Sequence, residues 1–465
     1  MADWQKLIAV PAAVASLALL AWPPDAFTPE MTRAAALSVF ALGLFAGGLF
    51  PEHVTAVLYF LIAMLFTVAP ASVIFSGFHS AAFWLVFGGL VISVAVGETG
   101  LGARIAHAIA ARLRPSYLTI IVGLAVMGLA TTFLIPSGMG RIVVFVPLVM
   151  AVADRFGFVE GTRGRTGILI TFSFCAIFPG FTILPANVPN VVLMGGIESQ
   201  YGVHLSYAEY MLLHFPVLGF LKCVIIVTLV WLLYRETPRQ HVVERQEDRS
   251  LPLPSKSLGN AERRLAAIVG AALLLWIFDF LHHISPGWIA LGAAFLCLMP
   301  GAGVLPPAAF ATKINFTPMF TTAGILGIAG LVAHSGIGEY LGQAMLEAAD
   351  LSPGDQGKTL ISLVATSVGV GLAATVVGIP AVMVPLAGGV SEATGMSLDV
   401  VLMTQAVAYS TVILPYQLPP LLVAAQVTGL GLAVTSRFCL LLAVITMVVL
   451  LPLDFLWWSM LGYLD

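Results

Sequence analysis

Two passages of small, polar and helix-breaking residues interrupt the apolar sequence, one in each half of the chain. The first comprises residues 137–141 (SGMGR) and, further on, 185–190 (PANVPN). The second comprises residues 375–378 (TVVG) and, further on, 415–420 (PYQLPP). Where a membrane helix turns or unwinds, its free backbone N–H and C=O groups must be buried in protein or face a water-filled cavity. Such groups can bind ligands, because helix N-termini suit anions and unwound carbonyls suit small cations.

We therefore expect a ligand to bind between these turns and breaks. The predicted substrate-binding residues are Ser137, Gly138, Met139, Gly140 and Arg141 at the first turn, Thr375, Val376, Val377 and Gly378 at the second, and Thr182, Asn187, Asn190, Thr411 and Gln417 at the helix breaks. If sodium binds as a coupling ion, Ser137, Asn187 and Thr375 are its expected ligands. For any single one of these side chains, a hydrogen bond between packed helices, worth about 0.6 kcal/mol in a membrane, is the alternative.

Arg141 is the residue that most needs an explanation. A charged side chain at membrane depth costs at least about 2.5 kcal/mol on the insertion scale, so a functional role is the default hypothesis. Its planar, permanently charged guanidinium can bind carboxylate, sulfate or phosphonate groups, or act as a tethered substitute for a bound cation. A snorkelling side chain, or a clamp on backbone carbonyls at the turn, is the alternative.

Lys222 is a second charge within an apolar span. The sequence offers Asp279, near the end of another span, as a conceivable partner. A scaffold ion pair, a dimer contact and transport chemistry all remain open for this lysine. Histidines near span ends are expected to anchor the protein at the membrane interface, and of these only His334 is a candidate proton relay. The other histidines of this group are His79, His214, His282 and His283.

Composition defines the environment of these residues. Of 465 residues, 59% are hydrophobic and 9% charged, and the mean hydropathy is +1.01. Soluble domains have an apolar share of about half and a charged share of about a quarter, so the chain is predicted to be a polytopic membrane protein. A net charge of −3 without a basic tract argues against nucleic-acid partners.

Cofactors and catalysis find no support in the sequence. The cysteines lack the spacing of metal or redox sites and are predicted to be small core residues. These are Cys175, Cys223, Cys297 and Cys439. No metalloprotease, Walker A or nucleophile-elbow motif is present, so no enzymatic activity is expected. Apart from a possible sodium ion, no cofactor is expected.

Apolar stretches long enough to cross about 30 Å of hydrocarbon provide the supporting elements. They fall at residues 7–22, 33–50, 54–71, 82–98, 167–196, 208–233, 264–281, 287–303, 317–335, 400–428 and 436–460. The first lacks an A-x-A cleavage site and is predicted to be a retained span. Two further stretches, 116–153 and 359–391, are interrupted by the turns described above.

Loop charges predict how these stretches cross the membrane, because basic residues mark the cytoplasmic side. Both flanks of residues 116–153 are basic, so this stretch is predicted to be a re-entrant hairpin from the cytoplasm. The flanking residues are Arg104, Arg112, Arg114, Arg155, Arg163 and Arg165. Acids predominate around residues 359–391, so that hairpin is predicted to enter from outside. With the N-terminus inside and the C-terminus outside, the two copies form an inverted repeat.

The predicted fold class is an all-α polytopic membrane protein with about eleven transmembrane helices and two re-entrant hairpins. The expected divisions are an extra span (1–30), a first repeat with the cytoplasmic hairpin (31–233), a cytoplasmic linker (234–263) and a second repeat with the outer hairpin (264–465). The alternative is that the glycines and prolines are ordinary kinks, which membrane helices tolerate.

This pattern resembles the divalent anion/sodium symporter family, the solute carrier 13-like members of the ion transporter superfamily, over roughly residues 30–460. The resemblance is carried by the proline in the second arm of each hairpin, Pro147 and Pro385, and by the loops 186–190 and 416–420. The family has a Ser-Asn-Thr signature at each hairpin tip. Here residues 137–139 keep only the serine, and residues 375–377 keep only a hydroxyl.

The resemblance implies a homodimer in which a fixed scaffold supports a hairpin-bearing domain that moves like an elevator. We therefore expect a secondary active transporter of small, preferably divalent, organic or inorganic anions in the lipid bilayer of the cytoplasmic membrane. The missing signatures leave sodium coupling open. Proton coupling, exchange, uncoupled transport, a passive channel, and a membrane subunit that depends on a binding protein are the alternatives.

Overall fold

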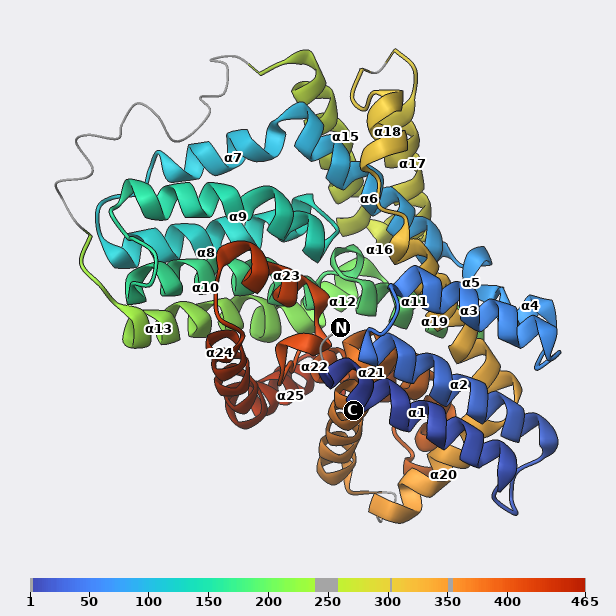
Figure 1. Cartoon of the computed structure of the whole chain (residues 1–465). Helices are drawn as coiled ribbons and strands as arrows, with labels where there is room; N and C mark the ends of the chain where they lie inside the picture. The colour runs from blue at the N-terminus through green and yellow to red at the C-terminus, as the bar shows by residue number, and fades with distance from the viewer. Residues whose placement is uncertain (1–2, 239–257, 302, 350–353, 465) are drawn as a thin grey trace.

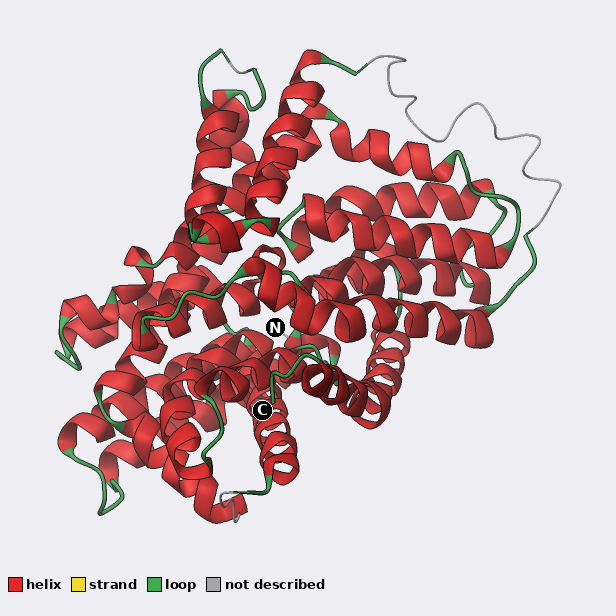
Figure 2. Cartoon of the chain, turned by 180° about the vertical axis from the view of Figure 1, so that it is seen from behind, coloured by secondary structure: helices red, strands yellow, loops and turns green. Residues whose placement is uncertain are grey.

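The structure, a computed structural model, describes residues 3–238, 258–301, 303–349 and 354–464. All regular secondary structure in these ranges is helical (Figure 2). Within this described part of the chain, eight helices are long and apolar enough to cross a membrane, and several shorter apolar helices accompany them. Every apolar stretch expected to span coincides with a helix or a pair of helices. The all-helical, multi-span class is therefore confirmed, whereas residues 239–257 of the expected linker lie outside the described residues.

One group of helices, which we call the framework, lies along the top and the right-hand side of the molecule in Figure 1. Within it α1 packs on α2, α3 packs on α19, and α6 packs on α17. The framework helices are α1 (Asp3–Ala21), α2 (Pro29–Gly47), α3 (Glu52–Leu65), α4 (Ala71–Ile74), α5 (Ser76–His79), α6 (Ala81–Thr99), α7 (Leu101–Ala110), α15 (Asn260–Ile277), α16 (Asp279–His282), α17 (Pro286–Leu298), α18 (Pro307–Lys313), α19 (Thr317–His334) and α20 (Ile337–Ala349).

The first predicted hairpin consists of α8 (Tyr117–Leu134) and α9 (Gly138–Arg155). Extended backbone at Ile135 and Ser137 separates the two arms, and the Ser137 hydroxyl caps α9 by accepting a hydrogen bond from the Gly140 N–H at 3.1 Å. At the base, the Tyr117 hydroxyl donates to the Gly164 carbonyl at 3.2 Å, and Arg165 pairs with Asp154. These contacts fix the hairpin to the start of the following helix.

The second predicted hairpin lies within α21 (Gln356–Thr394). The helix is interrupted at Ala374 and at Thr375, whose φ of 62° is rare for a β-branched residue. A Cβ built on Gly371 would lie 2.9 Å from Ile379 Cδ1, so the two arms meet directly beside this turn. Residues 356–373 and 376–394 are thus the two arms, slightly longer than the predicted stretch 359–391.

Each hairpin is followed by a broken helix. The first comprises α10 (Arg163–Ile177), the 3₁₀ turns η1 (Phe178–Thr182) and η2 (Leu184–Ala186), and α11 (Val188–Tyr201); the second comprises α22 (Leu398–Tyr409), η4 (Pro415–Gln417) and α23 (Pro419–Thr428). Side-chain amides satisfy the freed backbone groups. Asn190 Nδ2 donates to the carbonyls of Gly180 and Ile183, both at 2.8 Å. Gln417 Oε1 accepts from the backbone N–H groups of Ile413 and Leu414 at 2.9 and 2.8 Å.

The last span of each half contains a π-helical segment. In the first half α12 (Tyr207–His214) continues through η3 (Phe215–Leu221) into α13 (Lys222–Tyr234); in the second, α24 (Leu432–Ile445) continues through η5 (Thr446–Leu450) into α25 (Leu451–Met460). Hairpin, broken helix and π-interrupted helix therefore occur in the same order in both halves. Short π-helical insertions are frequent at functional sites.

The two halves interlock through their hairpins. α9 packs against α23, and the second arm of α21 packs against α11. The Tyr201 hydroxyl at the end of α11 donates to the Val384 carbonyl at 2.7 Å and accepts from the Gly388 N–H at 3.0 Å. We call this interlocked set, α8–α13 and α21–α25 with their connecting turns, the hairpin unit.

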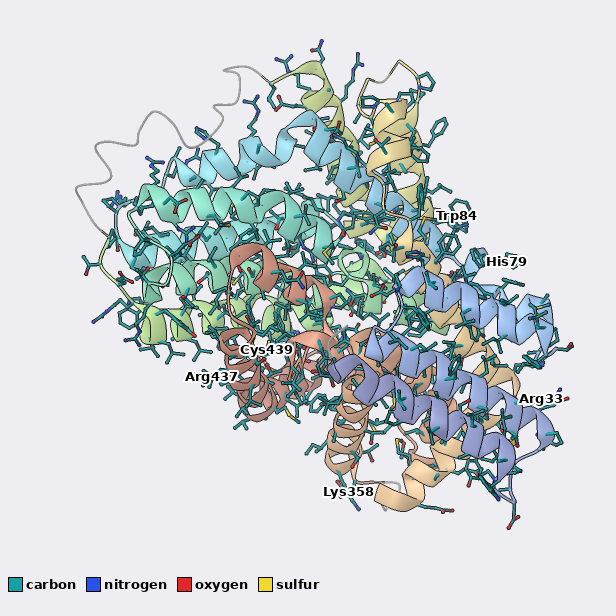
Figure 3. All side chains as sticks on the ribbon, viewed as in Figure 1. Arg33, His79, Trp84, Lys358, Arg437 and Cys439 are labelled. Atoms are coloured by element: carbon teal, nitrogen blue, oxygen red, sulfur yellow. The ribbon has the colours of Figure 1, made fainter. Side chains whose placement is uncertain are left out.

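Charged side chains separate into exposed and buried groups. Arg33, Lys358 and Arg437 are exposed and lie at the outer edge of the molecule (Figure 3). On the framework, Arg104 binds Glu262 through two hydrogen bonds of 3.0 and 2.9 Å. The Arg104 guanidinium and the Gly259 N–H lower the pKa of the Glu262 carboxyl. Arg141 and Lys222, by contrast, are fully buried.

Candidate functional site

A cavity of about 130 Å³ lies where the two hairpin turns and the two broken helices converge. The hairpin unit contributes the first tip (136–139), residues 185, 187–189 and 191 of the first break, Val377 of the second tip, and residues 418–420 of the second break. The framework contributes residues of α3, α6 and α19. The cavity thus lies at the boundary between the hairpin unit and the framework.

Five helices begin at the wall of this cavity. α3, α9, α11, α19 and α23 each place their first or second residue there. A helix N-terminus carries about half a positive charge, so the cavity lies in a positive field. α23 begins with two prolines, which lack N–H donors, and so contributes its dipole rather than hydrogen bonds from these positions. The arrangement favours an anion.

The structure brings some of the predicted binding residues to the cavity and places others behind it. Ser137, Gly138, Met139, Asn187 and Val377 line it. The described residues that line it do not include Gly140, Arg141, Thr182, Asn190, Thr375, Val376, Gly378, Thr411 or Gln417. Several of these polar groups serve the backbone instead: the Thr182 hydroxyl donates to the Pro179 carbonyl at 2.7 Å, and the Thr411 hydroxyl to the Val407 carbonyl at 2.9 Å.

Arg141 lies behind the first tip and joins it to the first broken helix. Its Nη1 donates to the Ile135 carbonyl at 2.9 Å, and its Nη2 donates to Asn187 Oδ1 at 3.1 Å. A Cβ built on Gly180 would lie 2.7 Å from Nη2, so a glycine at this position leaves the guanidinium its space. This geometry matches the carbonyl clamp and the tethered cation more closely than direct contact with a ligand in the cavity.

The residues expected to bind sodium do not fit that ion at the first tip. Asn187 Oδ1 and the Ile135 carbonyl accept hydrogen bonds from the guanidinium, and the Ser137 hydroxyl accepts one from the Gly140 N–H. A metal cation among these oxygens would lie against a permanent positive charge. Thr375, the third expected ligand, belongs to the other hairpin and does not line the cavity.

Lys222 meets the second break. Its Nζ donates to the Ser410 carbonyl at 2.7 Å, where α22 ends, and lies 5.1 Å from the centre of the Phe178 ring at the first break. The expected partner Asp279 is wrong: it accepts from the Ser206 hydroxyl at 3.0 Å and from the Tyr207 N–H. The acid that acts electrostatically on Lys222 is Asp454 of α25.

Two further residues escaped sequence reasoning. Glu52, the first residue of α3, lines the cavity, and its Oε2 accepts from the Thr321 hydroxyl at 2.9 Å. An acid directly after Pro51 at the start of a span was the available signal. His214, expected at the membrane interface, is instead fully buried between Tyr210 and Trp458.

A larger cavity of about 970 Å³ lies elsewhere between the hairpin unit and the framework. Its wall is formed by the end of α11, the second arm of α21, and parts of α19 and α20, including His334. None of the predicted substrate-binding residues lines it. The smaller cavity is therefore the candidate binding site, and the larger one is a separate gap between the two groups of helices.

Two helical hairpins that meet two broken helices around one cavity define the architectural class of secondary membrane transporters. Comparison with known families agrees with this class. The chain belongs to the family described as the sodium:sulfate symporter transmembrane region, which matches residues 1–464. The predicted resemblance to divalent anion/sodium symporters is confirmed.

Individual relatives are distant. The chain is 23% identical over 273 residues to a membrane protein of Cupriavidus necator, covering 58% of this chain and 52% of the relative. It is 20% identical over 299 residues to the sodium-dependent dicarboxylate transporter SdcS of Staphylococcus aureus, covering 58% and 56%. For SdcS of Staphylococcus saprophyticus the identity is 20% over 373 residues, which cover 72% of this chain and 69% of that relative. The chain thus spans only about half the length of the first two relatives.

The fold is similar to a solved structure. The YdaH transporter of Alcanivorax borkumensis superposes with a TM-score of 0.54 and 14% identity, covering 99% of this chain and 98% of that one. At this identity the likeness concerns the fold alone.

Proposed function

We propose that this protein is a secondary active transporter of small anions, preferably dianions such as sulfate and dicarboxylates, across the cytoplasmic membrane. The observation that carries the proposal is the convergence of five helix N-termini on one cavity at the boundary of the hairpin unit. The family description and the names of the relatives suggest the anions to test first. We assign the protein no enzymatic activity.

Arg141 supplies a fixed positive charge behind the first tip. Electrostatic interactions are stronger in a protein interior than in water, so a buried guanidinium stabilises an anion on the other side of a single turn of backbone. Because this charge is covalently attached, the first tip needs no sodium ion. Sodium dependence, if present, has to arise elsewhere in the chain.

Glu52 makes the anion affinity of the site depend on the position of the hairpin unit. Its carboxylate lies on the framework and faces the cavity, whereas the tips that would hold the anion belong to the hairpin unit. With the hairpin unit in its present position, an ionised Glu52 repels an anion bound in the cavity. This repulsion weakens when the hairpin unit moves along the framework and carries the anion away from Glu52. An elevator-type movement therefore gives the site two different affinities in two positions.

The predicted topology places the site near the cytoplasmic side. Counting spans from an inside N-terminus puts the starts of α3 and α19 on the cytoplasmic side, and both of these starts reach the cavity. The conformation described is accordingly inward-facing, with the N-terminus inside and the C-terminus outside. A homodimer formed through the framework completes the proposal.

Ligand-induced thermal stabilisation of the purified full chain tests the function. Sulfate, succinate, acetate and chloride are compared at equal ionic strength, each as the sodium and the potassium salt. A bound dianion at about 100 times its Kd stabilises the folded state by about 2.7 kcal/mol, and we expect this for sulfate or succinate with either cation. Arg33→Ala, which removes an exposed arginine, serves as the control and keeps the response, whereas Arg141→Ala loses it.

The contrary outcomes are clear. If none of these anions raises Tm beyond the shift that ionic strength produces, the cavity is not a site for small anions. If stabilisation requires sodium, the guanidinium does not replace the ion at the first tip, and the charge assignment fails while transport stands.

A further inference from the structure

A cluster of polar side chains is buried in the hairpin unit away from the anion cavity. His214 of α12, Lys222 of α13, and Asp454 and Trp458 of α25 are all fully buried. The His214 ring lies 5.5 Å from the Trp458 ring and 4.7 Å from the Tyr210 ring. Lys222 directly follows the π-helical segment η3, and Asp454 lies in the first turn of α25, which follows the π-helical segment η5.

Most of the polar atoms in this cluster have no partner. Among the described residues, both carboxyl oxygens of Asp454, both ring nitrogens of His214 and the Trp458 Nε1 lack a hydrogen bond. Buried polar groups are nearly always satisfied, and an isolated buried carboxylate is the most unfavourable of these cases. Asp454 lies within electrostatic range of Lys222 without pairing to it, because Lys222 Nζ is bonded to the Ser410 carbonyl.

The cluster contacts both helix breaks. Lys222 binds the carbonyl of Ser410, where the second break begins, and its ammonium faces the Phe178 ring of the first. The Tyr210 hydroxyl donates to the Phe181 carbonyl in the first break at 2.8 Å and is hydrogen-bonded to the Tyr409 hydroxyl. Tyr409 directly precedes Ser410. A change of charge in the cluster therefore acts on the backbone of both breaks.

A third cavity lies against two aromatic neighbours of the cluster. It measures about 360 Å³, and its lining includes Tyr210 and Tyr463. The exposed side chains of His204, Glu209 and Asp399 also line it. Tyr463 packs on Trp458 with ring centroids 5.6 Å apart. The titratable groups around Asp454 are thus Tyr210, His214, Lys222, Tyr409 and Tyr463, and the exposed His204, Glu209 and Asp399 line the cavity beside them.

We propose that Asp454 is a proton-binding site that couples anion transport to protons. The inference rests on the proposed transport function. When Asp454 is protonated it is neutral, and the Lys222 ammonium stays on the Ser410 carbonyl and holds the second break in its present form. When the proton leaves, the carboxylate draws the ammonium away from Ser410 and frees that carbonyl. One proton enters from the 360 Å³ cavity, resides on Asp454, and is released after the hairpin unit has moved.

Coupling follows from reciprocity. If the protonated form holds the break in the arrangement that binds the anion, the bound anion must in turn raise the affinity of Asp454 for its proton. One proton carried with a dianion moves one net negative charge, so a difference of about one pH unit supports about a tenfold accumulation of the dianion when the membrane potential is held at zero.

Infrared difference spectroscopy of the purified full chain tests the proton site without any ligand. Wild type, Asp454→Asn and the control Asp25→Asn, which alters an exposed loop acid, are compared through a pH titration. We expect a carboxylic acid C=O band that disappears with rising pH in wild type and in Asp25→Asn. Its absence from Asp454→Asn assigns it. Persistence of the band in Asp454→Asn, or its absence from folded wild type, would overturn the proposal.

Proteoliposomes test the coupling. Labelled sulfate and succinate are followed with a pH gradient, with the membrane potential held at zero by valinomycin and equal potassium on both sides, and, separately, in anion-for-anion exchange without a gradient. We expect Asp454→Asn to lose the roughly tenfold gradient-driven accumulation while retaining exchange. Gradient-driven accumulation by Asp454→Asn contradicts the inference alone. If wild type neither accumulates nor exchanges either anion, the proposed substrate class fails, and the infrared assignment still decides the proton site.

Discussion

The two helix breaks are each matched with one buried cation, but the two cations differ in kind. At the first break the cation is the guanidinium of Arg141, which comes from the hairpin tip and is charged at neutral pH. At the second it is the ammonium of Lys222, which comes from another helix and has Asp454 beside it. The first break thus has a constant charge, whereas the charge balance at the second can change with one proton.

The largest effect is expected from Arg141→Ala. It removes two hydrogen bonds from a charged donor, each worth about 1.5–3 kcal/mol, and leaves the Ile135 carbonyl and Asn187 Oδ1 without a cation. We expect a marked fall in Tm, loss of anion binding, and a Tm that now responds to sodium over potassium. Arg141→Lys should recover part of the stability. Anion affinity unchanged in Arg141→Ala would return the arginine to a purely structural role.

Lys222→Met is expected to rank next. It removes one hydrogen bond from a charged donor to the Ser410 carbonyl, a loss of about 1.5–3 kcal/mol in unfolding free energy. If Lys222 and Asp454 act as a pair, the double variant Lys222→Met/Asp454→Leu should be more stable than the sum of the single changes by about 0.5–3 kcal/mol. Chemical denaturation in detergent measures this cycle, and additive effects would show that the two residues are independent.

Gly180→Ala distinguishes the first break from the second without touching a charge. The new Cβ would lie 2.7 Å from Arg141 Nη2 and 2.9 Å from Asn187 Nδ2, so the guanidinium must move. Overpacking of this kind costs about 1–3 kcal/mol. The matched control Gly270→Ala, with no atom within 4 Å of the added carbon, should be neutral or slightly stabilising. Equal thermal stability of the two variants would contradict the tight placement of Arg141.

Tyr409→Phe should have the smallest effect on stability and the most specific effect on coupling. It removes the hydrogen bond to Tyr210 that links the two breaks, worth about 0.6 kcal/mol in a membrane protein. We expect nearly unchanged Tm and exchange, with less anion accumulated per unit of pH gradient. Tyr340→Phe, on α20 of the framework and away from this link, is the control. Full accumulation by Tyr409→Phe would show that the breaks do not communicate through the tyrosines.

Sequence reasoning succeeded where a pattern had only one physical solution. Breakers within an apolar stretch and basic residues on both of its flanks predicted the first hairpin, and the structure has its turn at residues 135–137. The same logic identified Arg141, because an arginine in such a place is unusual whatever its role. Family membership was predicted from the spacing of breakers and prolines, although both tip signatures are missing.

Side-chain direction and long-range pairing could not be obtained in this way. Whether Arg141 faces the cavity or the first break depends on how the tip packs against α10 and η1. A single sequence contains no information on this packing. Asp454 was overlooked because it follows Pro452 in a run of apolar residues that already explained the span. Asp279 was preferred as the partner of Lys222 only because it stood near the end of a span, and the structure uses it to cap α12.

Tyr201 gives the interlocked hairpins a further consequence. It belongs to the first broken helix, yet its hydroxyl holds two backbone groups of the second hairpin. The second hairpin is therefore tied to the first half, and it cannot move separately from the rest of the hairpin unit without breaking these two hydrogen bonds. In a transporter built in this way, an ion cannot cross by displacing one hairpin alone, because the hairpin unit has to move as a whole. The membrane therefore stays closed to uncoupled ion leak between transport cycles.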